Sequence, residues 1–173
     1  MAKKKKSGIL HYVFVGVEIV LLILLICTLA MPIFSLTTEV SSGIIGSSSS
    51  STSLMSATEF ISNIFNGDIT GFWAIATLIF YFLTLLLAVV ILLVEILKFV
   101  GVKISIKPKA LEILLVAVTL IFFVLAIIFG ATNNDAGSLG SVIASEFTMA
   151  ISWAVIISAV SAIGCLVAKF LDR

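Results

Sequence analysis

Four long apolar runs constrain the fold of this chain more than any other feature of the sequence. They cover residues 9–31, 72–100, 110–129 and 142–170, and each reaches the ~20 residues that a helix needs to cross the hydrocarbon core of a membrane. Only helices satisfy their backbone hydrogen bonds within one such segment. Because 61% of the residues are hydrophobic and 11% are charged, polar surface is too scarce for a water-soluble globule. We therefore predict an all-α integral membrane protein, a four-transmembrane-helix bundle that forms a single membrane domain over residues 1–173.

The basic residues predict the orientation of this bundle, because all ten Lys and Arg residues fall into three stretches of the chain. Four crossings place these stretches on one side of the membrane, and the excess of positive charge on cytoplasmic loops makes that side the cytoplasm. Both termini and an inner loop at 101–109 are then cytoplasmic, and the outer loops cover residues 32–71 and 130–141. We expect the lysines to contact anionic lipids of the inner face. The three stretches contain Lys3, Lys4, Lys5 and Lys6; Lys98, Lys103, Lys107 and Lys109; and Lys169 and Arg173.

A cleaved signal peptide is the alternative for the first run, since such peptides also begin with basic residues followed by an apolar stretch. The run at 9–31 is longer than the roughly 7 to 15 apolar residues of a signal peptide. We therefore interpret it as an uncleaved first helix.

The larger outer loop differs in composition between its two halves. Residues 35–53 are rich in serine and punctuated by glycine, which favours a flexible tether. In the second half, Ser56 and Glu59 have the spacing of a capping box, so a short amphipathic helix should begin at Ala57 and end near Gly67. Such a helix would lie on the outer membrane surface or cover the bundle. Positioning the second crossing is its favoured role, and binding is the alternative.

Small residues recur every four positions in the fourth run, at Ala150, Ala154, Ser158 and Ala162. Helices in lipid associate through close backbone approach at small side chains. This pattern predicts a helix-packing ridge that presses the fourth helix against a neighbour in the same subunit or in another copy.

Glu18 lies among aliphatic residues of the first run. Counting from residue 9 places it roughly 14 Å from the inner boundary, at the depth expected for Thr119, Ser158 and Ser161. An acid that faces lipid at this depth costs about 3 kcal/mol. We therefore predict an intramembrane polar site in which Glu18 faces the fourth helix and these three hydroxyl side chains are its partners. A water-mediated proton route from Glu18 to His11, on the same helix face, is an alternative.

The remaining acids in the helices have local explanations. Glu95 precedes Lys98 by one turn, and Glu112 follows Lys109, in both cases near the inner boundary. Ion pairs within each helix or contact with lipid headgroups would account for them.

The residue inventory argues against an enzyme. The chain has one histidine, and we find no clustered acids and no glycine-rich phosphate loop, so we expect no catalytic residues, no cofactor-binding residues and no metal site. Two function classes remain. The favoured one is a membrane organiser or accessory subunit that acts through helix packing and its outer loop; the other is a proton-coupled small transporter or an oligomeric channel subunit that uses Glu18. The expected partners are the lipid bilayer, further copies of the chain or other membrane proteins, and not nucleic acid.

The layout of four spans with a larger first outer loop is similar to that of claudins and tetraspanins. The tryptophan and cysteine pattern of their outer loops is absent here. An acid midway along the first helix is also found in small multidrug-resistance exporters, whose compact loops do not match residues 32–71. No family is assigned on these likenesses. The small size and the lack of a glycosylation motif in the outer loops favour a plasma membrane in a bacterium.

Overall fold

The computed structural model describes residues 8–42, 48–102, 108–132, 135–138 and 143–171. The described part is mostly helical and contains four helices long and apolar enough to span a membrane, as the sequence predicts. These four helices are α1 (Gly8–Cys27), α3 (Phe72–Phe99), α4 (Pro108–Thr132) and α5 (Trp153–Leu171). The shorter elements are the 3-10 turn η1 (Thr28–Ala30), helix α2 (Ala57–Asn66), and strands β1 (Pro32–Ser42), β2 (Ser48–Ser56), β3 (Asp135–Ser138) and β4 (Ile143–Ile151).

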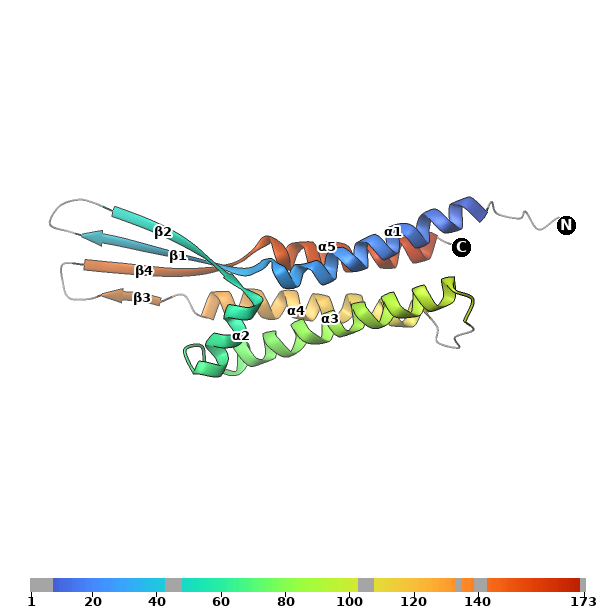
Figure 1. The fold of residues 1–173 in the computed structure, drawn as a ribbon. Helices are drawn as coiled ribbons and strands as arrows, with labels where there is room; N and C mark the ends of the chain where they lie inside the picture. Colours follow the sequence, from blue (N-terminus) through green and yellow to red (C-terminus); the bar gives the residue numbers. More distant parts are fainter. Residues whose placement is uncertain (1–7, 43–47, 103–107, 133–134, 139–142, 172–173) are drawn as a thin grey trace.

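The four long helices form one bundle, and the strands project from one end of it (Figure 1). Helix α1 packs against α5 and α3, while α4 packs against α3 and α5. The start of α1 and the end of α5 lie at the same end of the bundle, away from the sheet (Figure 1). The chain therefore enters and leaves the bundle on the same side.

The sheet corrects the prediction of an all-α protein. It has four antiparallel strands in the order β2-β1-β4-β3, so both connections at this end of the bundle contribute to it. Strand β1 pairs along its length with β2 and with β4; Phe34, for example, lies opposite Met55 on one side and Ile151 on the other.

The serine-rich segment expected to be a flexible tether supplies part of β1 and most of β2. Its β-branched residues Thr37 and Thr38 favour extended backbone. Pairing with β4, far away in the sequence, then adds backbone hydrogen bonds that the local composition does not reveal.

The boundaries of two predicted crossings also change. The run at 142–170 was expected to be helical throughout, but β4 occupies its first part and α5 begins at Trp153. Ser145, Glu146 and Thr148 interrupt the apolar pattern there, and strand pairing supplies the backbone partners. The first helix ends at Cys27, before the predicted residue 31.

Helix α2 begins and ends where its sequence signals predict. The Ser56 backbone N–H donates to Glu59 Oε2 at 2.7 Å, and the Glu59 N–H donates to Ser56 Oγ at 3.3 Å, which completes the capping box. Gly67 follows the helix with φ of 82°, a left-handed conformation that suits glycine. Phe60 is buried, whereas Phe65 is 82% exposed.

Aromatic side chains fill the interior on the sheet side of the bundle. Phe34 of β1, Phe60 of α2 and Phe129 of α4 are all buried, and their ring centroids lie 5.2 to 5.3 Å apart. We call these three residues the aromatic trio. It joins the sheet and the short helix to the bundle.

Candidate functional site

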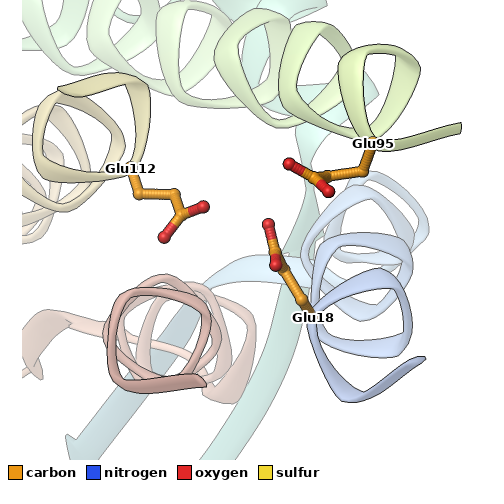
Figure 2. A group of neighbouring side chains, drawn as sticks. All are labelled: Glu18, Glu95 and Glu112. Carbon is orange, nitrogen blue, oxygen red and sulfur yellow. The ribbon is translucent and has the colours of Figure 1, made fainter. Parts of the chain in front are cut away.

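Each long helix contributes one buried ionisable side chain to a single group at the interior of the bundle. The group consists of Glu18 from α1, Glu95 from α3, Glu112 from α4 and Lys169 from α5, with exposed fractions of 1%, 5%, 0% and 8%. We call these four residues the charged cluster. Figure 2 shows its three carboxyl groups converging from separate helices.

Lys169 is the centre of this cluster. Its Nζ donates to Glu95 Oε1 at 2.8 Å and to both carboxylate oxygens of Glu18, at 3.0 and 3.3 Å. It lies 3.7 Å from Glu112 Oε1. Hydrogen bonds between charged groups are stronger than neutral ones, so one ammonium group links α5 directly to α1 and α3.

Glu95 also accepts a hydrogen bond from Lys98 Nζ at 3.1 Å. The sequence predicted this pair within α3, and the structure confirms it. Lys98 is less buried than the cluster, with 28% of its side chain exposed. Glu95 thus connects Lys169 to a partly exposed second lysine.

Glu112 differs from its predicted environment. Lys109 does not explain it, because the Lys109 Nζ lies over the Phe170 ring, 5.4 Å from the ring centroid. Glu112 turns into the bundle instead, and within the described part of the chain neither of its carboxyl oxygens accepts a hydrogen bond from a donor. A fully buried carboxyl without a donor is an unusual arrangement in a protein interior.

Helical periodicity explains why the four side chains meet. Each charged residue continues the buried stripe of its own helix, at spacings of three, four and seven residues. In α4, for instance, Glu112 is followed at these spacings by buried Leu115 and Thr119; in α5, Lys169 is preceded by buried Cys165 and Ala162. This continuity is the sequence signal for the buried positions of Glu95, Glu112 and Lys169, three residues predicted above to lie at the membrane boundary.

The structure places Glu18 against α5, but with a different partner from the three predicted hydroxyls. Besides the bonds from Lys169, the Cys165 Sγ donates to the Glu18 backbone carbonyl at 3.8 Å. Helix α1 begins beyond the end of α5 (Figure 1), so counting from the start of the apolar run placed Glu18 too deep. It lies level with the last turn of α5.

The predicted partners of Glu18 are all buried but bond elsewhere. The Thr119 hydroxyl donates to the Leu115 carbonyl and the Ser158 hydroxyl to the Val155 carbonyl, both at 2.7 Å within their own helices. Ser161 Oγ is buried and has no hydrogen-bond partner among the residues that the structure describes. The polar site is therefore built from ionisable groups and not from hydroxyls.

The predicted packing ridge lies partly inside the subunit. Ala154, Ser158 and Ala162 of α5 are at most 3% exposed. Ala150 is not part of it, because it is an exposed residue of β4. Two residues after Ala162, a Cβ at Gly164 would lie 2.9 Å from the Leu21 side chain, so α5 and α1 pack closely within one chain.

A cavity of about 620 Å³ reaches the charged cluster between α1 and α3. Glu95, Lys98 and Lys169 line it together with His11 and Tyr12. His11 and Glu18 were predicted to share a helix face, and the structure places His11 on the wall of this cavity. The cluster thus has a route toward the end of the bundle that lies away from the sheet.

The cluster has the ligand spacing of a cation site. One oxygen from each of Glu18, Glu95 and Glu112 lies within 4.8 Å of the others, a spacing that suits a metal ion held by oxygen ligands. The Lys169 ammonium already lies among them and acts as an internal cation. Among the described residues, these three carboxylates and the two lysines Lys169 and Lys98 leave a formal excess of one negative charge.

No protein-family model matches the sequence, and no curated protein sequence matches it. Functional inference therefore depends on the geometry of the fold and of the charged cluster.

Proposed function

We propose that this protein is a membrane organiser or accessory subunit, in which four membrane-spanning helices hold a sheet that contacts neighbouring membrane proteins. The observation that supports this proposal is the position of the sheet. Its strands come from two separate connections and extend well beyond the ends of the helices (Figure 1). A sheet that extends beyond the helices provides a surface for contact with another protein, whereas a short turn between helices does not.

Strand β2 is the part of the sheet best suited to contact a partner. It is an edge strand whose nine residues, SSSSTSLMS, include no lysine and no proline, the residues that commonly protect sheet edges from further pairing. Its residues 50–54 are all exposed. An edge of this type can accept a strand from another chain through backbone hydrogen bonds.

The interior of the bundle fits a static role. Lys169 links α1, α3 and α5 at one end, and the aromatic trio joins β1, α2 and α4 at the other. Ionic groups buried in this way can fix the register of packed helices. We infer that the bundle is a firm support for the sheet.

A proton-coupled transporter or an oligomeric channel subunit is the second candidate, and the buried charged cluster with its cavity favours it. Intramembrane ionisable residues commonly mark ion pathways. The cavity, however, opens away from the sheet, and large side chains such as Phe122 and the aromatic trio pack the interior on the sheet side. This packing supports the organiser over the conduit.

We further propose that the sheet faces outward from a bacterial plasma membrane and that both termini are cytoplasmic. The support is the distribution of lysines: Lys98, Lys109 and Lys169 all lie at the helix ends away from the sheet (Figure 1). The tetralysine at residues 3–6 and Lys103 and Lys107 lie outside the described residues. Their positive charge would favour contact with anionic lipids of the inner face.

A site-specific photo-crosslinker tests whether the sheet contacts another protein. We would introduce it at Ser51 on β2 and, as a matched control, at exposed Leu97 of α3 at the opposite end of the bundle. In native membranes, the organiser role predicts a discrete protein adduct at Ser51 and none at Leu97. The adduct mass separates a second copy of this chain from a different protein. Failure to form an adduct at any β2 position would contradict the proposal.

A flux measurement tests the second candidate. Proteoliposomes containing the wild-type chain should show no proton flux above that of empty vesicles if the organiser role is correct. A flux that the substitution Glu18→Gln abolishes, with the fold retained, would favour the conduit instead.

A further inference from the structure

We propose that the charged cluster takes up one further monovalent cation at Glu112, either a proton or an alkali metal ion. This inference goes beyond the organiser role and does not depend on it. Lys169 already links the helices through Glu18 and Glu95. The proposal adds a binding site at the third acid of the cluster.

The first support is the charge balance of the cluster. Within the described part of the chain, Glu18, Glu95 and Glu112 carry three formal negative charges when ionised, and Lys169 and Lys98 carry two formal positive charges. Burying an uncompensated charge is costly, so buried acids are paired, coordinated or protonated. One monovalent cation makes the group neutral.

The second support is the hydrogen bonding of Glu112. Glu18 and Glu95 both accept hydrogen bonds from Lys169. Glu112 is 0% exposed, and among the residues that the structure describes no donor hydrogen-bonds to either of its oxygens. Figure 2 shows its carboxyl group pointing toward those of the other two acids. Glu112 is therefore the side chain to which we assign both the excess negative charge and the oxygen atoms that accept no hydrogen bond.

The surroundings of Glu112 define what it can bind. Glu18 from α1, Glu95 from α3 and Lys169 from α5 lie beside it. Lys98 contacts the cluster through Glu95, and Cys165 contacts it through the Glu18 backbone carbonyl. A proton would turn the Glu112 carboxyl into a donor for a neighbouring carboxylate. A small alkali metal ion would instead sit among hard oxygen ligands. A divalent ion would overcompensate the single excess charge unless Lys169 moved away.

Access to the site comes from the cavity between α1 and α3. Glu95 and Lys169 contribute both to the wall of this cavity and to the cluster, and His11 and Tyr12 complete the wall. Glu112 does not line the cavity itself, so a cation that enters from this end would have to pass between the Glu95 and Lys169 side chains that separate the cavity from Glu112. The site is thus connected to the end of the bundle where the helix-terminal lysines lie.

Two measurements on the full chain in lipid nanodiscs test the proposal. Equilibrium binding of radioactive sodium ions detects the metal ion, and infrared difference spectroscopy across a pH series detects a protonated carboxyl group. We expect either one bound sodium ion per chain or one protonated carboxyl per chain. Glu112→Gln should abolish the signal, and Glu59→Gln, at an exposed residue outside the bundle, should retain it.

The measurement on the wild-type chain can overturn the proposal by itself. The proposal therefore remains testable even if the Glu112→Gln chain does not fold. If wild type shows neither bound sodium nor a protonated carboxyl, the inference is wrong. A signal that persists in folded Glu112→Gln also overturns it. As a second variant, Lys98→Gln increases the excess negative charge of the cluster from one to two. We expect the number of bound sodium ions or protonated carboxyl groups per chain to rise from one to two. An unchanged number would contradict the argument from charge balance.

Discussion

Replacing Lys169 with methionine is the most informative single perturbation of this fold. Methionine has a similar length and keeps the apolar stem, but it removes the ammonium group at the centre of the charged cluster. Glu18 and Glu95 then lose hydrogen bonds of 2.8 to 3.3 Å. Three carboxyl groups remain, each at most 5% exposed, with Lys98 as the remaining cation among the contacts described.

The expected cost follows from the burial of these groups. Removing one partner of a buried ion pair typically destabilises a protein by about 3 to 5 kcal/mol. For a chain of this size, each kcal/mol lowers the melting temperature by roughly 2 to 4 °C. We therefore expect Lys169→Met to lower the melting temperature by about 6 to 20 °C.

The assay is thermal unfolding in detergent, followed by circular dichroism, with Glu112→Gln as the matched comparison. Glu112→Gln removes the excess negative charge and no hydrogen bond to Lys169, so it should be close to neutral. A Lys169→Met protein that melts within about 1 °C of wild type, well under the shift expected for a lost buried ion pair, would refute the view that Lys169 holds the helices together. Equal losses for both substitutions would refute the special position of Lys169 within the cluster.

Three further predictions test other parts of the fold: a glycine contact, a helix cap and the pH dependence of that cap. Gly130→Ala should destabilise the protein by about 1 to 3 kcal/mol, because the added Cβ would lie 3.0 Å from the Met149 carbonyl oxygen. Gly16→Ala should be neutral or stabilising, because a Cβ there would meet no described atom within 4 Å. Equal effects of the two substitutions in thermal unfolding would contradict the contact at Gly130. Ser56→Ala should cost about 1 kcal/mol through loss of the cap, seen as faster hydrogen exchange in α2. The Ser56 backbone N–H holds the pKa of Glu59 below its ordinary value, so Glu59 stabilises α2 above that value. This contribution is lost as the pH falls through the lowered pKa, and pH-independent protection of α2 would contradict it.

Much of the helical architecture could be predicted because the signals are local. Apolar run length sets the four helices, and the capping residues at Ser56 and Glu59 set the start of α2. The sheet could not be predicted in the same way. Its central strands β1 and β4 lie over a hundred residues apart, as in the pairing of Ser35 with Ala150, and their stability depends on that distant pairing.

The charged cluster was only partly predictable. Glu18 stands out because it interrupts an apolar run, and the prediction that it faces the last helix was available from its cost in lipid. Glu95, Glu112 and Lys169 lie near helix ends, where charged side chains commonly reach the headgroup region. Whether these side chains point into the bundle or toward the headgroups depends on how far each helix extends past its neighbours. Counting residues along the sequence does not give this relative position of the helices.

A double-mutant cycle between Glu18 and Lys169 tests the central claim most directly. Thermodynamic stability would be measured for wild type, Glu18→Gln, Lys169→Met and the double variant. If these side chains meet in the bundle as the 3.0 Å contact indicates, the double variant should be more stable than the sum of the single effects predicts, by about 1 to 3 kcal/mol. Single effects that add to within about 0.5 kcal/mol would show that the two residues do not interact and would contradict the charged cluster.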